Sequence, residues 1–389
     1  MSSEWQSQRG RIRDVIPNLQ LGSWPTGHLN SITDVPGVLV HTESIQPDQD
    51  VNTGVTTILP RPDWTKYSSF AGIFRFNGCG ELTGSHWIEE TGLLTSPIIL
   101  TTSSAIGDAY RGVLDYAFQN HSNANGDMEL FLIPVVAETY DGFLNNQGRF
   151  AVTPSHIVNG IKKAAPDRVP EGNTGGGTGM ICHRHKGGTG SSSRQIRGFD
   201  AEGNDKTYTV GVLVQANYGA AKNLRIGGVP IGELLQAEHT SAGRSVPSSA
   251  AGREPRKDGS IIVVVATDVP LTPVQLQRVA RRATVGLSKV GGYGSNSSGD
   301  IFLAFSTGNK IPVANFSFTS GGSPYQPQPQ DVQMTNTDTV DGVFEAAADA
   351  TEEAIYNALF MGESMTGFQG RSVEALDLAK VKKMVEDRL

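Results

Sequence analysis

The residue in the most distinctive chemical setting is Ser260. It follows a polar, charged stretch at 239–259 (HTSAGRSVPSSAAGREPRKDG) and begins the run SIIVVVA at 260–266, in which five residues are β-branched. A serine that becomes a chain terminus carries a hydroxyl nucleophile and an α-amine, whose unperturbed pKa is about 8. Such an amine can act as a local general base without a histidine. The junction can therefore support cleavage of the chain's own Gly259–Ser260 bond.

Gly259 suits that cleavage, because the Ser260 hydroxyl must attack the carbonyl just before it and a residue without a Cβ leaves the approach open. The long preceding loop supplies slack for the new chain end, and a first place on a buried strand holds the nucleophile rigid. The alternative interpretation is structural, since polar loops commonly enter a strand through a turn residue. Taken alone, the junction favours the turn.

The elements that must position Ser260 alternate between strands and helices. Strands are expected within 31–60 and at 68–76, 97–102, 129–136, 207–215, 260–266 and 301–306. Helices are expected at 86–94, 104–118, after Thr272-Pro273, at 340–361 and at 373–389. Residues 172–194 are rich in Gly, Ser and Thr with little periodicity, and 239–259 are expected to form an exposed, mobile loop.

Five ordered motifs carry a resemblance to a known family. They are DGSIIVVVATDVPL at 258–271, VQANYG at 214–219, PVVAETYDG at 134–142, GGGTGMIC at 175–182 and NSSGDIFLAFS at 296–306. Together they resemble the DmpA/BapA-type β-aminopeptidases and L-aminopeptidase/D-amidases, from about Arg11 to near the C-terminus. Because the motifs coincide in order, the combination is far more specific than any one of them.

The resemblance implies a four-layer αββα sandwich, as in N-terminal-nucleophile hydrolases. It implies one domain, 1–389, that cleaves itself into an α-chain of 1–259 and a β-chain of 260–389. It also implies homo-oligomers, commonly tetramers, and release of N-terminal L-, D- or β-amino acids from peptides, amides or esters through an acyl-enzyme on Ser260. Neither a metal nor an organic cofactor is expected.

By the same resemblance, Ser298 and Asp300 are the second serine and the acid that family members place near the nucleophile. Some members have Glu where this chain has Asp300, one methylene shorter. The pair can orient the Ser260 hydroxyl and relay its proton, whereas the acid's charge would favour a protonated amine nearby, so its role stays open. The structural alternative is that SSGD at 297–300 is a turn before a strand, and both can hold together.

Three further residues receive roles in substrate handling. The side-chain amide of Asn217, at a strand end, can donate to a tetrahedral oxyanion, although Asn also commonly ends strands. Glu138, at a pocket mouth, can hold the free ammonium group of a substrate, which would explain removal of N-terminal residues. Tyr140 can donate to the oxyanion or orient the substrate. A solvated loop is the competing interpretation, and for Asp141 it is the preferred one.

Other motifs are set aside. The glycines at 175–179 do not follow a strand or open a helix, so the context of a dinucleotide site is missing, and the loop is expected to let the backbone approach the scissile bond. His183 and His185 lack a common metal spacing and are expected at the surface or behind the site. The serines near Gly294 do not fit a Gly-x-Ser-x-Gly elbow.

Composition and charge limit the binding partners and the cellular location that are expected. The net charge is −7 and no dense basic tract occurs, so nucleic acid is not an expected partner. Cys79 and Cys182 are expected as buried thiols without a disulfide. No apolar run is long enough to span a bilayer, and residues 1–21 lack an apolar signal core. A cytoplasmic enzyme acting on small peptides or amino-acid amides is expected.

Two alternatives remain at this level. One is a related N-terminal-nucleophile acyltransferase or a hydrolase of ω-amino-acid oligomers, which would have no need of an ammonium-binding Glu138. The other is a non-catalytic assembly protein that kept the fold, against which the joint presence of Ser260 and its matching partners argues.

Overall fold

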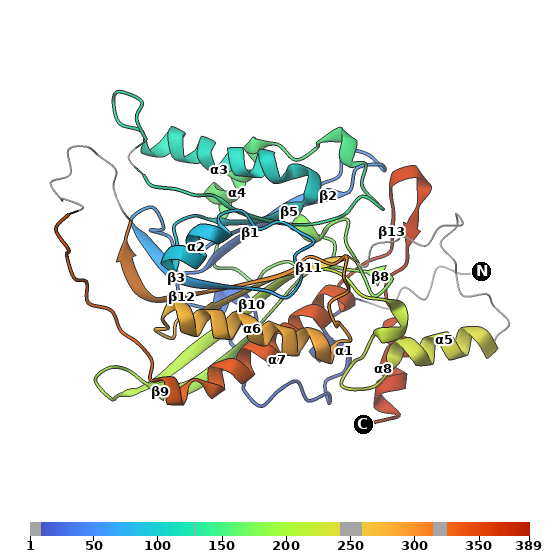
Figure 1. Ribbon diagram of the computed structural model, residues 1–389. Coiled ribbons are helices and arrows are strands. Elements are labelled where there is room, and N and C mark those ends of the chain that lie inside the picture. Colours follow the sequence, from blue (N-terminus) through green and yellow to red (C-terminus); the bar gives the residue numbers. More distant parts are fainter. Residues whose placement is uncertain (1–8, 129, 242–258, 314–324) are drawn as a thin grey trace.

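The computed structural model describes residues 9–128, 130–241, 259–313 and 325–389, apart from the side chains of residues 239 and 241. The elements form layers in which helices lie outside two sheets (Figure 1). The first sheet has the order β1-β2-β5-β6. Its strands are β1 (Leu39–Ile45), β2 (Thr53–Leu59), β5 (Ile98–Thr102) and β6 (Val135–Thr139), and the helices that cover it are α3 (Ile106–His121) and α4 (Pro154–Lys163).

The second sheet has the order β4-β3-β12-β11-β10-β9. Its strands are β4 (Leu93–Leu94), β3 (Tyr67–Arg75), β12 (Asp300–Pro312), β11 (Ser260–Thr267), β10 (Asp205–Asn217) and β9 (Gly188–Phe199), and its covering helices are α6 (Pro273–Lys289) and α7 (Asp341–Phe360). Strand β11 pairs antiparallel with β10 and parallel with β12. The sheet therefore places the start of β11 beside the end of β10 and the start of β12.

The remaining elements are short or peripheral. They are α1 (Ile12–Val15), α2 (Ser85–Thr91), α5 (Ile231–Ser241), α8 (Leu378–Glu386) and the two-residue strands β7 (Ile181–Cys182), β8 (His185–Lys186), β13 (Met365–Thr366) and β14 (Ser372–Val373).

Three buried apolar clusters match the three interfaces between layers. One joins α3 and α4 to the first sheet, a second fills the space between the sheets, and a third joins the second sheet to α6, α7 and α8. Alternate residues of β11 illustrate the arrangement: Ile262 and Val264 face the other sheet, whereas Ile261 and Val263 face the helices. Since side chains alternate across a strand, a strand that is apolar on both faces must lie between two layers. The αββα expectation is confirmed.

Local sequence explains the elements around the site. All residues of β11 are buried, as its β-branched run predicts. The helix α6 begins at Pro273 behind Thr272, whose side chain accepts from the Gln275 N–H, so the predicted cap is confirmed. Strand β9 lies against α7 so closely that a Cβ on Gly190 would come 1.9 Å from the Ala354 carbonyl oxygen. Close packing explains why a stretch rich in Gly and Ser forms a strand there.

Several predicted boundaries are wrong. Strand β6 begins at Val135 rather than at 129, since Pro134 has no N–H for the ladder and its carbonyl instead accepts from Thr83. The expected helix at 86–94 ends at Thr91, where Gly92 adopts a left-handed conformation. The last helix begins at Leu378 rather than at 373. Helix α5 extends into the loop expected from 239, and residues 242–258 lie outside the described chain.

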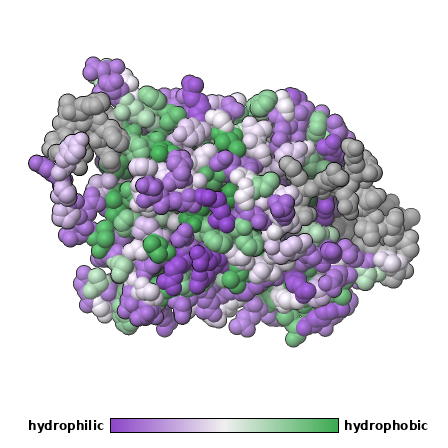
Figure 2. All heavy atoms as spheres, in the orientation of Figure 1, coloured by the Kyte–Doolittle hydropathy of each residue, from purple (hydrophilic) through white to green (hydrophobic). Residues whose placement is uncertain are grey.

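The surface on the face shown in Figure 2 intersperses hydrophobic and hydrophilic residues. Among the described residues, every helix is too short or too polar to cross a membrane. Both cysteines are free, as expected, but Cys79 is exposed rather than buried.

Candidate active site

Three neighbouring strands bring Asn217, Ser260 and Asp300 to one edge of the second sheet. Asn217 ends β10 and lies opposite Ser260, the first residue of β11. Asp300 begins β12 and lies beside Ile261 in the parallel ladder. The pairing therefore gathers three of the predicted site residues that are far apart in the sequence.

Gly259 is required by the close approach of β10. A Cβ at this position would lie 1.6 Å from the backbone carbonyl oxygen of Asn217 and 3.0 Å from its Nδ2. Because a backbone carbonyl cannot swing aside as a side chain can, only glycine fits without moving the strand. The peptide before Ser260 is thus held against Asn217.

The hydroxyl of Ser260 is nearly buried and is held by a backbone donor. The side chain is 7% exposed, and its Oγ accepts from the Gly299 N–H at 3.0 Å. Gly299 lies between the two other candidate residues, Ser298 and Asp300. The loop that carries these residues therefore also fixes the oxygen of the nucleophile.

Ser298 lies between two acceptors. Its Oγ is 2.5 Å from the Gly259 carbonyl oxygen and 2.6 Å from Asp300 Oδ1. A hydroxyl has one proton, so Ser298 can donate to both partners only in alternation. If Asp300 is neutral with its proton on Oδ1, Asp300 donates to Ser298 and Ser298 donates to the Gly259 carbonyl. If Asp300 is ionised, Ser298 donates to Asp300 instead.

The environment of Asp300 favours the neutral form. Burial raises the pKa of its carboxyl above the ordinary value, although hydrogen bonds from Ser298, Asn77 and the Ile261 N–H act in the opposite direction. All three donors are neutral groups. When Asp300 holds a proton on Oδ1, a chain of donors can run from Asp300 through Ser298 to the carbonyl before Ser260.

The side-chain amide of Asn217 has a fixed orientation. Its Oδ1 accepts from the Ile181 N–H at 2.8 Å, and its Nδ2 donates to the Tyr140 carbonyl oxygen at 2.9 Å. Nδ2 carries a second N–H, as required of an oxyanion donor. Tyr140 reaches Asn217 through its backbone; the residue is 49% exposed, and its ring lies against Gly142.

Glu138 lies close to the loop that carries Ser298 and Gly299. Its Oε1 accepts from the Glu81 N–H at 3.2 Å, and its Oε2 bonds to the Ser103 hydroxyl. A Cβ on Gly80 would come 3.3 Å from Glu138 Oε1 and 3.1 Å from the Gly299 Cα, so one glycine separates the carboxylate from the loop. Burial raises the pKa of Glu138, partly offset by the bonds from Ser103 and Glu81.

The expectation that Asp141 is solvated is wrong. Its side chain is buried and accepts from Thr102 at 2.7 Å, Asn145 at 2.9 Å and Gln147 at 3.0 Å. Burial raises the pKa of this carboxyl as well. The following turn folds back, with the N–H groups of residues 144 and 145 bonded to the Asp141 carbonyl, and this encloses the side chain.

The two histidines also differ from each other. His183 is fully buried, not at the surface, with its ring edge-on to Tyr218 and its Nδ1 3.1 Å from the Ala220 carbonyl oxygen. Burial lowers the pKa of His183 to about 4, so the ring is neutral. His185 is half-buried in β8. No group of three His, Cys, Asp or Glu side chains suited to a metal ion occurs in the described ranges.

The glycine-rich loop serves the packing of the two sheets more than the scissile bond. A Cβ on Gly176 would come 1.9 Å from Gln215 Oε1, and one on Gly177 would come 2.1 Å from the Thr189 nitrogen. The loop reaches the site through Ile181, whose N–H orients Asn217. A short hairpin, not a helix, follows it, which agrees with the rejection of a dinucleotide site.

Sequence reasoning missed Asn77, Ser103 and the backbone N–H of Gly299. Asn77 donates to Asp300 Oδ2 at 3.2 Å and to the Ser295 carbonyl oxygen at 3.0 Å. Its position just after β3, within Asn-Gly-Cys-Gly, brings it to Asp300 because β3 is the neighbour of β12 in the sheet, a pairing that no local sequence pattern marks. A hollow beside Asp300 and Ser298, lined also by Tyr218, Leu287 and Tyr293, adjoins the site.

Comparisons with known proteins agree with this geometry. The profile of the family described as Peptidase family S58 matches residues 30–373. The beta-peptidyl aminopeptidase BapA of Sphingosinicella microcystinivorans is 40% identical over 374 residues, which cover 92% of this chain and 88% of the relative.

Two solved structures share the fold over nearly the whole chain. A beta-aminopeptidase of a Burkholderia species has a TM-score of 0.84 at 41% identity, with 97% of this chain and 99% of that chain covered. The L-aminopeptidase D-Ala-esterase/amidase of Ochrobactrum anthropi, described as a serine aminopeptidase with a variant of the Ntn hydrolase fold, has a TM-score of 0.81 at 38% identity, with 97% and 98% covered.

Proposed function

This chain belongs to peptidase family S58, and from that premise we propose that Ser260 is the nucleophile of an aminopeptidase that first cuts its own Gly259–Ser260 bond. The membership makes the protein a hydrolase of peptide bonds with an N-terminal serine nucleophile. The roles of individual residues, the self-cleavage and the choice of substrate form the proposal.

The observation that carries the proposal is the contact of Ser298 with the Gly259 carbonyl oxygen, at 2.5 Å. In self-cleavage, the Ser260 Oγ attacks the Gly259 carbonyl carbon, and the negative charge that develops on the oxygen is stabilised by Ser298 and the second N–H of Asn217. The C–N bond then breaks, the Ser260 nitrogen takes up the proton that Oγ gave up, and an ester joins the Gly259 carbonyl to Ser260 Oγ. Water hydrolyses this ester.

Turnover repeats the same chemistry with a substrate in place of residue 259. The α-amine freed at Ser260 accepts the hydroxyl proton as Oγ attacks the substrate carbonyl, and it returns a proton to the leaving amine. The acyl-enzyme on Ser260 is then hydrolysed by water. In this proposal Asn217 and Ser298 stabilise each oxyanion, and Asp300 holds Ser298.

Glu138 would confine the enzyme to substrates with a free amine. Its carboxylate is separated from the Gly299 loop by Gly80, so an ammonium group of a substrate acylating Ser260 lies within its reach. We also propose that N-terminal β-amino acids are among the residues released, because relatives about 40% identical carry the name beta-peptidyl aminopeptidase. A homo-oligomer, commonly a tetramer, and a cytoplasmic location stay predictions.

The test is the substitution Ser260→Ala. The wild-type protein should run as two bands near two-thirds and one-third of 41.4 kDa, and N-terminal sequencing of the smaller band should begin SIIVV. The variant should remain one full-length band without activity on amino-acid p-nitroanilides. An uncut wild-type chain that still hydrolyses these substrates would overturn the self-cleavage, and an active Ser260→Ala variant would overturn the nucleophile.

A further inference from the structure

Residues 77–81 connect the two acidic groups of the candidate site. At one end, the Asn77 side chain donates to Asp300 Oδ2. At the other, the Glu81 N–H donates to Glu138 Oε1. Between them, the Cys79 N–H donates to the Ser298 carbonyl oxygen, and Gly80 packs on Gly299. This segment, here called the 77–81 strap, therefore fixes the loop that carries Ser298 and Asp300.

The strap makes the two oxygens of Asp300 chemically different. Oδ2 accepts from Asn77 at 3.2 Å, and Asn77 is itself held by the Ser295 carbonyl oxygen at 3.0 Å. Oδ1 faces Ser298 at 2.6 Å and the Ile261 N–H at 3.3 Å. Among the described partners, each oxygen accepts one amide N–H, and Oδ1 alone also faces a hydroxyl, that of Ser298. A proton on Oδ1 can therefore be donated to Ser298, whereas a proton on Oδ2 would compete with the N–H of Asn77.

We propose that Asn77 is a positioning residue, which keeps the proton of Asp300 on the oxygen that faces Ser298 and so directs the Ser298 hydroxyl to the reacting carbonyl. The inference rests on the proposed function. Without the Asn77 donor, a proton on Oδ2 would leave Oδ1 as an acceptor only. Ser298 would then donate to Asp300 and withdraw its hydrogen bond from the carbonyl.

The described groups that face Asp300 are uncharged, so hydrogen bonds rather than a nearby charge decide which carboxyl oxygen carries the proton. Ser298 faces Asp300 from the loop before β12, Ile261 from β11, Asn77 from the strap, and Tyr218 from just after β10. Burial keeps the pKa of Tyr218 well above its ordinary value, so its ring is uncharged at neutral pH. In the uncut chain, the hydrogen bonds alone therefore orient the acid.

The experiment follows self-cleavage of the full chain against pH in Asn77→Ala and Asn77→Asp. For Asn77→Ala we expect a rate about tenfold lower at the acidic plateau, because the proton is no longer confined to Oδ1. We also expect the fall in rate with rising pH to occur at a higher pH, because a donor that favours ionised Asp300 is gone. Asn77→Asp replaces the donor with a competing acid and should cleave more slowly still.

Asn204→Ala is the matched control, since the Asn204 amide also donates to an aspartate oxygen, Asp200 Oδ2 at 3.0 Å, but at the exposed turn between β9 and β10. It should match the wild type at every pH. A merely structural role for Asn77 would lower thermal stability and leave the pH midpoint unchanged, and that result would overturn the inference. Cleavage in Ser260→Ala would instead refute the proposed function, whatever the Asn77 variants do.

Discussion

Asp300 and Glu353 are both buried carboxylic acids, yet their partners differ in charge. Among the residues that the structure describes, the hydrogen-bond donors to Asp300 are neutral, and burial raises its pKa. Burial acts on Glu353 in the same direction, but bonds and charges from Arg13 and Arg194 outweigh it, and the net pKa of Glu353 is lowered. Two guanidinium groups therefore favour the ionised form of Glu353, whereas burial among neutral donors makes Asp300 hold its proton to a higher pH than an exposed aspartate would.

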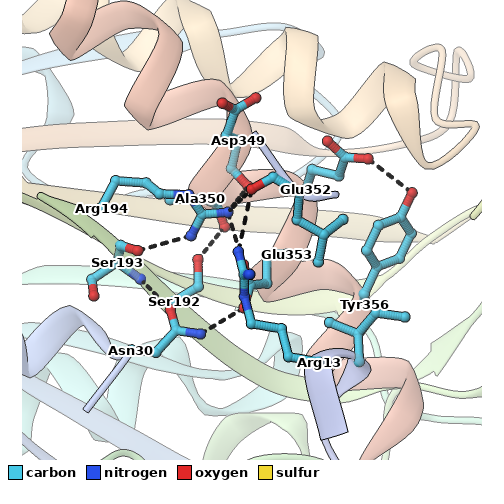
Figure 3. A network of polar contacts seen from close by, with 12 residues as sticks. Arg13, Asn30, Ser192, Ser193, Arg194, Asp349, Ala350, Glu352, Glu353 and Tyr356 are labelled. Atoms are coloured by element: carbon cyan, nitrogen blue, oxygen red, sulfur yellow. Dashed lines mark hydrogen bonds and ion pairs between the residues drawn. The ribbon is translucent and has the colours of Figure 1, made fainter. Parts of the chain in front are cut away.

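Glu353 and the side chains that bind it, here called the Glu353 network, connect separate parts of the chain (Figure 3). Arg194 on β9 is fully buried and contacts Glu353 at 2.7 Å, and Arg13 binds both carboxylate oxygens at 2.8 Å. Asn30 adds a bond of 2.6 Å. Glu353 belongs to α7, within 260–389, whereas its partners belong to 1–259. The network would thus join the two fragments after self-cleavage, at a distance in sequence from the reacting groups.

The largest effect should come from removing the exchangeable acid with Asp300→Ala. Self-cleavage should slow by about 10²–10⁴-fold, the range of general acid–base catalysis, since Ser298 loses the partner that supplies its proton. In the wild type, the rate should fall as pH rises through the raised pKa of Asp300, whereas the residual rate of the variant should be flat. Band intensities followed over time and pH measure both rates. Rapid cleavage by the variant would remove Asp300 from the mechanism.

Glu353→Ala should lower the stability of the fold and leave the rate of self-cleavage unchanged. It leaves a fully buried Arg194 without its counter-charge, and the free energy of unfolding should fall by about 3–5 kcal/mol. Because the folded pKa of Glu353 is lowered, its contribution is present above the unfolded pKa and is lost as pH falls through the folded one, so the deficit should shrink in acid. Denaturation in urea at several pH values measures this.

The matched comparison uses Glu353→Gln, which keeps an acceptor for Asn30 and should lose less stability than Glu353→Ala. In both variants, the cleavage rate per folded molecule should equal that of the wild type. A stable Glu353→Ala protein that fails to cleave would show that the network acts on the site and would break the contrast between the two acids.

The strand ends of the site were predictable because their signals are local. A β-branched run after a polar loop predicted β11, and Asn217 was expected at a strand end. The nearness of Ser298 and Asp300 to Ser260 was implied by the family resemblance, not by a local signal. What the sequence could not give was which polar groups are buried. Asp141 and His183 lie in loops that read as solvated, but the turn after Asp141 and the ring of Tyr218 enclose them.

Asn77 and β9 are two further features that the sequence alone does not predict. Asn77 meets Asp300 only because β3 pairs with β12 across more than two hundred residues of chain, and no local pattern marks that pairing. Strand β9 is rich in Gly and Ser because α7 packs tightly on it, a demand imposed by a neighbouring layer rather than by the strand. The strand propensity of a segment predicts neither the contact of Asn77 with Asp300 nor the packing of α7 on β9.

The smallest effect should come from Glu138, a third buried acid. Ser103 and the Glu81 N–H, which donate to it, are neutral, but its proposed role needs its charge. Glu138→Gln should raise KM for free-amine substrates by about 10–100-fold, the worth of one charge-assisted bond, and leave self-cleavage unchanged. Since burial raises the pKa of Glu138, the wild-type KM should fall as pH rises through that value, and the variant should lack this fall. Steady-state kinetics on an amino-acid p-nitroanilide and on its N-acetylated analogue measure the difference. An equal loss on the free-amine and the N-acetylated substrate would mean that Glu138 shapes the pocket instead of binding the ammonium group. Neutral hydrogen-bond donors around a buried acid would then not be enough to identify it as a functional group.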